Sequence, residues 1–538
     1  MSKILIPILT NRNDIFSACH LIGSIANENP HTEISVLTFK DLEIHFSVIA
    51  NISNIYSIDR DFISSINDSP LYSDSFALNN FFASIQDCID TEWDKVINFS
   101  NDEVSSYLCS MFNAKETAGT TISTFGSPVT ANTWSTYYNF VSPQMQFDVI
   151  SRNSIRHNMS STNYHADATR IRVNQEYATV AASNFTKIRK TKDTTSNANI
   201  IGISLKRSFQ GRMMDFNSVV EVVETLESSD RYRAVLILSG SQEEKEFANE
   251  LNYKFNNTLI SINTDLAASP SVLMNVDFLI TTNNEHLILA DALDTKIIEV
   301  KPESTGRENS SVVNPGNFVI FQKETTSISN DIILMLNEEF ETELPITSMY
   351  SDHSIYTHIE DDYGVSMTQI RGDIDIQQEL RYHIERCYHY QLLGFPINNE
   401  LITHIRDNTG KEELAAFVTK SKDELTETVK VLLATLRSLK GVKQSKNNLN
   451  SFIGYLDNLI QRSRTDSITR GAIAMFEGNV ENIDTTNSEE NIKAIETFLF
   501  KLKNDLQILT NMLNEIASRA TTTSTHERVN EDIQQTEA

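Results

Sequence analysis

The chain has 538 residues, a length that predicts about three domains of ordinary size. Its 72 acidic and 45 basic residues give a formal net charge of −27, which opposes binding to nucleic acids and to anionic membranes. Four cysteines without a CxxC spacing argue against a disulfide framework or a zinc site and suit a reducing compartment. The apolar runs are too short for a membrane helix, and the first residues lack the flanks of a signal peptide. We therefore expect a cytoplasmic protein that binds no nucleic acid.

The first part of the chain alternates between strand patterns and helix patterns. Apolar runs at residues 2–9, 32–39 and 52–59 are typical of strands, and residues 11–29 have the spacing of a helix. This alternation predicts a parallel sheet covered by helices. We assign this first Rossmann-like domain to residues 1–189.

A polar stretch, "KTKDTTSNAN", follows as an interdomain linker, and the alternation then begins again. Strand patterns occur at residues 200–205, 233–240, 258–262, 276–281 and 296–300. We assign a second Rossmann-like domain to residues 200–365. The expected fold class is α/β, with two facing Rossmann-like domains and a ligand cleft between the carboxyl ends of their sheets.

Beyond residue 365 the pattern is helical, which predicts an all-α domain at 366–520 and a disordered tail at 521–538. Apolar residues from Ile492 to Ile516 alternate at spacings of three and four, a seam that requires a partner helix. That partner is either the helix that spans Leu425 to Leu439, which would make an intramolecular bundle, or another protein chain. Self-association or docking of a partner protein is therefore one expectation for this region.

Asp14 is the first candidate for chemistry, because it lies at the turn between the first strand and the first helix. Its carboxylate should project into the cleft between the two domains. An aspartate at this place is equally consistent with a helix N-cap.

Several segments resemble glycosyltransferase family 9, the heptosyltransferase family, in the family's order and with compatible spacing. They begin with "KILIPILTNRNDIFSACHLIGSIANENPHTEISVLTF" and include "WDKVINFSNDEVSSYLCSMFNA", "NTWSTYYNF", "GRMMDFNSVVEVVETL" and "VLILSGSQEEKEFANEL". The resemblance covers roughly the first 325 residues and leaves the helical region unassigned. It implies the GT-B arrangement and inverting transfer of a sugar from a nucleotide-diphosphate donor, without a bound metal or other cofactor.

The resemblance also implies roles for individual residues. Asp14 matches the base that deprotonates the acceptor hydroxyl, and Arg212 stands where the family has a lysine near the donor diphosphate. Lys206 and Arg207 either help there or are ordinary surface charges. The turn that would contact the nucleotide contains Ser239, Gly240 and Glu243, although Glu243 is also typical of a first-turn helix acid.

The stretch "TTNNEHLILADALDTK" matches the family's phosphate-binding turn and the helix behind it, which assigns Thr282, Asn283 and Asn284 to the donor site. The match is incomplete, because Asn283 replaces an aspartate, Glu285 a glycine and Ile288 a histidine. Asn13 likewise replaces the glycine before Asp14. In the following loop, "STGRENSSVVNPGN", we expect Arg307 to bind a phosphate or to be a surface charge.

The favoured function is therefore inverting, metal-independent sugar transfer from a nucleotide sugar to a glycan or protein acceptor. The alternative is a catalytically impaired homologue that acts as a binding or scaffold subunit through its helical region. A sugar-nucleotide epimerase is a third candidate, which the turn at Asp14 fits less well.

Overall fold

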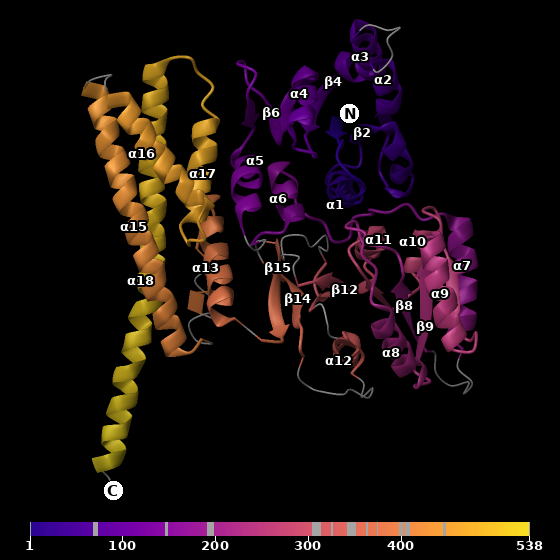
Figure 1. Ribbon diagram of the computed structural model, residues 1–538. Coiled ribbons are helices and arrows are strands. Elements are labelled where there is room, and N and C mark those ends of the chain that lie inside the picture. The colour runs from indigo at the N-terminus through magenta and orange to yellow at the C-terminus, as the bar shows by residue number, and fades with distance from the viewer. Residues whose placement is uncertain are drawn as a thin grey trace. The chain divides into compact units, whose positions relative to one another are not determined.

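The computed structural model describes residues 2–67, 74–145, 149–190, 198–303, 314–323, 327–341, 351–361, 364–373, 375–397, 402–403, 409–444 and 448–536. The chain divides into two compact units, each made of two segments (Figure 1). The sheet unit comprises Met1–Thr121 and Ile150–Asp373. The helical unit comprises Ile122–Val149 and Ile374–Ala538.

The first sheet of the sheet unit has five parallel strands in the order β3-β2-β1-β4-β5. These strands are β1 (Lys3–Pro7), β2 (Glu33–Phe39), β3 (Asn54–Ile58), β4 (Glu92–Ile97) and β5 (Asn113–Ala118). The helical segments of this half are α1 (Arg12–Glu28), η1 (Lys40–Val48), α2 (Arg60–Asn67), α3 (Asp74–Asp90), α4 (Glu103–Met111) and α6 (Arg152–Met159). The next helix along the chain, α7 (Gln175–Ile188), packs against α10 (Ser269–Leu273) of the second half. Leu5, Leu37 and Trp93 belong to its buried core. The strand order reverses between β1 and β4, and sheets of this kind bind ligands at the reversal.

The second sheet has eight strands in the order β10-β9-β8-β11-β12-β13-β14-β15, parallel as far as β13. The parallel strands are β8 (Asn199–Ser204), β9 (Tyr232–Leu238), β10 (Ile260–Asn263), β11 (Phe278–Thr281), β12 (Lys296–Pro302) and β13 (Phe318–Gln322). Its helices are α8 (Phe216–Glu227), α9 (Gln242–Lys254), α10 (Ser269–Leu273), α11 (Glu285–Ala292) and α12 (Ser329–Phe340). The order reverses between β8 and β11. Gly202 of β8 permits close packing against β9, because a Cβ atom would lie 2.9 Å from Ile237 Cδ1.

Two Rossmann-like sheets in one unit confirm the α/β class that the sequence predicts. The sheet unit nevertheless continues beyond residue 365, because β14 (Ser354–Asp361) and β15 (Gly364–Arg371) add an antiparallel pair to its edge. Their mixed polar and apolar sequence lacks the continuous apolar run of a buried parallel strand, which explains why the sequence pattern does not indicate them. None of the described helices is both long enough and apolar enough to cross a membrane.

The helical unit contains the predicted all-α region. Its helices are α13 (Ile376–Leu392), α15 (Lys411–Gln444), α16 (Leu449–Gln461), η6 (Arg462–Arg464), α17 (Arg470–Glu481) and α18 (Ser488–Thr536). α18 packs against α15 and α17, as Figure 1 shows in yellow and orange. The structure describes α18 as helical to Thr536, and the disorder that we expect at 521–538 stays a prediction.

The apolar seam of α18 is filled within the chain. Six of its side chains are at most 1% exposed: Leu499, Leu502, Leu506, Leu509, Leu513 and Ile516. They share one core with Leu425, Leu432 and Leu439 of α15. The helix that the sequence offers as an internal partner therefore covers this seam.

A segment from the first part of the chain belongs to the helical unit. It contains β7 (Pro128–Thr130), α5 (Thr133–Thr136), η2 (Tyr137–Val141) and η3 (Ser142–Gln144), and it follows β6 (Thr120–Ile122), which pairs with β7. The Tyr137 hydroxyl lies 2.8 Å from His389 Nδ1, and Arg386 donates a 2.8 Å hydrogen bond to the Val149 carbonyl. This arrangement differs from a continuous domain at 1–189, because the aromatic side chains of the segment pack against α13 and α17.

Candidate functional site

Asp14 lies in the first turn of α1, directly after β1 and at the reversal point of the first sheet. The N-cap of α1 is Asn11, whose side chain accepts a 3.0 Å hydrogen bond from the Asp14 backbone N–H. The alternative that Asp14 is itself the cap is therefore wrong. Its carboxylate does not cap the helix and points to other partners.

Three side chains donate hydrogen bonds to the Asp14 carboxylate. Arg156 donates to Oδ1 at 2.6 Å, and Thr10 and Asn11 donate to Oδ2 at 2.5 and 3.1 Å. The Arg156 side chain is 6% exposed, and its guanidinium lies 4.0 Å from the centre of the Phe99 ring. Asp14 itself stays 18% exposed. These contacts give the carboxylate a defined position without closing it off from solvent.

The sequence does not indicate Arg156, although it is the strongest partner of Asp14. It lies on α6, 142 residues from Asp14 along the chain, in the unremarkable pattern "SRNSIRHNM". Only a tertiary contact joins the two residues.

The polar turn between β11 and α11 binds the loop that follows β8. Asn284 is the N-cap of α11, and its side-chain amide donates a 2.9 Å hydrogen bond to the Lys206 carbonyl. Thr282 donates to the same carbonyl at 3.3 Å, and the Asn283 carbonyl accepts from the Phe209 N–H at 2.8 Å. All three turn residues are buried. These hydrogen bonds therefore join the loop after β11 to the loop after β8, at the reversal point of the second sheet.

Glu285 lies at the first position of α11 and is paired with two cations. The Lys206 ammonium is 3.2 Å from one carboxylate oxygen, and the Arg12 guanidinium is 3.9 Å from the other. The side chain is only 7% exposed. Lys206 is therefore not an ordinary surface charge, and the pairing offsets part of the repulsion that Glu285 would exert on a diphosphate.

His286 is part of the core of the second sheet. Its Nδ1 atom lies 2.8 Å from the Ser204 hydroxyl, and the side chain is buried. Burial, and then the nearby Lys206 ammonium, lower the pKa of His286 to about 3. The imidazole is therefore neutral at physiological pH and has a structural role.

The turn between β9 and α9 is occupied by Glu244. Its carboxylate accepts hydrogen bonds from the Ser239 N–H, from the Ser239 hydroxyl at 2.6 Å and from the Gly240 N–H at 3.2 Å. Gly240 has a φ of +93°, which glycine adopts without strain. Glu244 is 3% exposed, so the donors that we assign to a nucleotide already bind a carboxylate of the protein.

Glu243, which the sequence suggests for this turn, is engaged by the loop that follows β8. It forms an exposed ion pair with Arg207, and the hydrogen bond from that guanidinium lowers the pKa of the Glu243 carboxyl. Arg207 also donates a 3.1 Å hydrogen bond to the Gly211 carbonyl.

Of the two arginines proposed for the donor phosphates, the structure describes only Arg212. Arg212 is exposed, its backbone N–H donates to the Ser208 hydroxyl at 3.0 Å, and no ion pair of its guanidinium is recorded within the described part of the chain. Arg307 lies outside the described residues.

The helices that begin at the two candidate turns pack against each other. His20 of α1 and Asp291 of α11 are fully buried, with 3.4 Å between Nε2 and Oδ2, and burial holds the pKa of His20 well below its ordinary value. The Arg12–Glu285 ion pair joins the first turns of the same two helices. The carboxyl ends of the two sheets therefore lie at a common junction. Across the described ranges, no group of three or more His, Cys, Asp or Glu side chains is placed to hold a metal ion.

No family model matches the sequence, and no similar curated protein was found. Similar solved structures include a family 9 glycosyltransferase from Veillonella parvula, at 15% identity over 62% of this chain and 90% of that chain, with a TM-score of 0.41. Escherichia coli heptosyltransferase WaaC, solved with ADP-2-deoxy-2-fluoro heptose, is 13% identical over 63% of this chain and 99% of its own, with a TM-score of 0.42. UDP-GlcNAc 2-epimerase from Neisseria meningitidis is 13% identical over 63% and 91%, with a TM-score of 0.34. Neither activity nor residue roles follow from likenesses at this level.

Proposed function

We propose that the chain is a glycosyltransferase that moves a sugar from a nucleotide-diphosphate sugar to a hydroxyl group of a glycan or protein acceptor. The observation that carries the proposal is the position of Asp14, at the end of β1 and beside the junction of the two sheets. Ligands of Rossmann-like sheets bind beyond the carboxyl ends of the strands, where the strand order reverses. The family 9 resemblance of the sequence assigns a base to the same position.

In the proposed reaction, Asp14 accepts the proton of the acceptor hydroxyl while the acceptor oxygen forms a bond to the anomeric carbon of the donor sugar. The bond from that carbon to the diphosphate oxygen breaks in the same step, so the configuration inverts and the nucleoside diphosphate leaves. Arg156 is a positioning residue, because it fixes the carboxylate by a 2.6 Å hydrogen bond. The proposal includes no metal or other cofactor, since cationic side chains would stabilise the negative charge of the leaving diphosphate.

The proposed donor site lies on the loops that follow β8, β9 and β11. Lys206 places a cation beside the β11 turn, through its pair with Glu285. The residues that we propose for the donor are Arg212, Ser239, Gly240, Glu243, Thr282, Asn283, Asn284 and Arg307.

A second candidate function is favoured by two carboxylates. Glu244 occupies the N–H donors of the β9 turn, and Glu285 lies at the start of α11, where a diphosphate would otherwise bind. A homologue that has lost its donor would have such a site and would act as a binding or scaffold subunit through the helical unit. Self-association or a partner protein would then involve that unit.

Calorimetry with ADP-, UDP- and GDP-linked sugars, combined with an assay for released nucleoside diphosphate, distinguishes the two candidates. The transferase proposal expects one donor to bind and to turn over in the presence of a hydroxyl acceptor. Saturable binding should weaken in Arg212→Ala, with Arg231→Ala as an exposed arginine control outside the site. If no donor in the panel binds, the transferase proposal fails and the scaffold function stands.

A further inference from the structure

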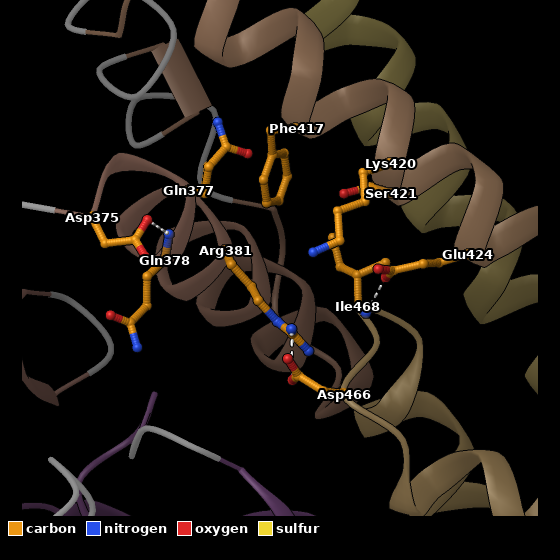
Figure 2. Close-up of a pocket in the computed structure, with 10 residues that line it drawn as sticks. All are labelled: Asp375, Gln377, Gln378, Arg381, Phe417, Lys420, Ser421, Glu424, Asp466 and Ile468. Carbon is orange, nitrogen blue, oxygen red and sulfur yellow. Dashed lines mark hydrogen bonds and ion pairs between the residues drawn. The ribbon is translucent and has the colours of Figure 1, made fainter.

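The helical unit contains a cavity of about 180 Å³ between the first turns of α13, the N-terminal half of α15 and the segment before α17. Figure 2 shows this cavity with its lining side chains. It belongs to none of the loops that we assign to the donor or to Asp14. Its lining combines an aromatic ring, an aliphatic side chain, two amides, a hydroxyl and five charged groups.

Arg381 and Glu424 of the lining are engaged by neighbouring groups of the protein. Arg381 donates to Glu385 at 2.8 Å and to Asp466 at 2.7 Å, so its charge is compensated by two carboxylates. Glu424 accepts a 3.0 Å hydrogen bond from the Ile468 N–H. With Asp375 counted, the lining has three carboxylates and two cations, which opposes an anionic ligand.

Several side chains of the lining can contact a ligand in the cavity. Figure 2 shows the Phe417 ring and the Ser421 hydroxyl turned toward the cavity, and both residues are buried. The Ser421 hydroxyl and the Lys420 ammonium have no recorded hydrogen bond to the described part of the protein. The side-chain amide of Gln378 offers both a donor and an acceptor.

From these observations we infer that the cavity binds a neutral sugar residue. A sugar ring has hydroxyls that both donate and accept, which match Ser421, Gln378 and the second oxygen of Glu424. Its C–H face is apolar and can lie on the Phe417 ring. Pockets for drug-sized ligands occupy ~300–1,000 Å³, so a cavity of about 180 Å³ is of the size for one ring and too small for a nucleotide.

This inference deepens the proposed function, because it names a glycan as the acceptor class and gives the helical unit a role in holding it. Binding to the cavity does not require turnover, so the two proposals can fail separately.

Ligand-observed saturation-transfer NMR on the full-length protein tests the inference. The probes are the methyl β-glycosides of glucose, galactose and N-acetylglucosamine at millimolar concentration. At least one should receive saturation from the wild-type protein. Gln378→Ala and Ser421→Ala each remove one hydrogen-bonding group. Each should therefore raise the dissociation constant of the sugar roughly fivefold, and the double variant should raise it more.

The matched control is Gln507→Ala, an exposed glutamine of α18 whose amide contacts Asn511, and it should bind the sugar like the wild type. Saturation of none of the three glycosides, or equal affinity of the double variant and the wild type, would overturn the inference. Displacement of the sugar by millimolar phosphate or acetate would overturn it as well, since the site would then prefer an anion. If the sugar binds and the release of nucleoside diphosphate is absent, only the transferase proposal fails.

Discussion

Two neighbouring glutamates illustrate how the site is determined at the scale of single residues. Composition and resemblance direct attention to Glu243, but Glu244 is the residue that binds the turn after β9. Ser241 is the N-cap of α9, and Glu244 follows it by three positions, the spacing of a capping box. That local pattern would have indicated Glu244. No local pattern could have indicated Arg156, because it reaches Asp14 only through the tertiary fold.

Glu244→Gln tests the importance of that carboxylate. Glutamine has the same shape but lacks the charge that accepts hydrogen bonds from two backbone N–H groups and a hydroxyl. We therefore expect the free energy of unfolding to fall by about 1–3 kcal/mol. Urea unfolding followed by circular dichroism measures the change. Glu243→Gln is the control and should leave the midpoint unchanged, since its ion pair is exposed. Equal midpoints for all three proteins would show that the turn does not need Glu244.

Buried histidines predict how stability depends on pH. Burial lowers the pKa of His286 and His389 to about 3 and that of His358 to about 4. Below the ordinary histidine pKa of 6.5, these imidazoles bind protons in the unfolded state but stay unprotonated in the folded state. The free energy of unfolding therefore falls as the pH falls from 7 toward 4. Each histidine contributes a loss of about 2 kcal/mol at pH 5.

Urea titrations at pH 7, 6 and 5 measure this slope. His286→Gln should make the slope shallower, because one of the buried imidazoles no longer titrates. A stability that is the same at pH 7 and pH 5 would contradict the assignment of these imidazoles as neutral.

At the scale of elements, apolar runs predict the buried parallel strands well. Each of β1, β8, β9 and β11 contains a continuous apolar run, as expected for strands that are covered on both faces. The antiparallel pair β14–β15 has no such run. The placement of residues 122–149 in the helical unit depends on contacts with α13 and α17, more than 200 residues later, and periodicity carries no information about them.

Two glycines of the helical unit test that placement. A Cβ atom on Gly478 of α17 would lie 2.6 Å from Phe140 and Thr136 of the inserted segment, whereas a Cβ atom on Gly454 of α16 meets nothing within 4 Å. We expect Gly478→Ala to destabilise the helical unit by about 1–3 kcal/mol. Gly454→Ala should stabilise it by about 0.5–1 kcal/mol, because alanine favours a helix.

Fluorescence can report on the helical unit alone. The chain has two tryptophans, so in a Trp93→Phe background Trp134 of the inserted segment is the sole emitter. Unfolding curves for the two alanine variants that shift in the same direction would contradict the contact between α17 and this segment.

At the scale of the whole molecule, the seam of α18 is buried within its own chain. A second copy could use the same side chains only if the bundle opened, which would expose Leu499 to Ile516 to water. We therefore expect light scattering on the full-length protein to give the mass of one chain, 60.8 kDa. A doubled mass that persists on dilution would mean that another surface of the protein associates.

The central claim is that Asp14 acts as a base in sugar transfer, and two variants of its ion pair test it most directly. Asp14→Asn removes the base, whereas Arg156→Gln breaks the same ion pair and leaves the carboxylate. The measurement is the rate of nucleoside diphosphate release from the donor that binds, with thermal unfolding of both variants as the check on folding. We predict that Asp14→Asn lowers the rate ~100- to 10,000-fold, with donor affinity unchanged, and that Arg156→Gln lowers it far less. Equal rates for Asp14→Asn and the wild type, or equal losses in both variants, would contradict the claim.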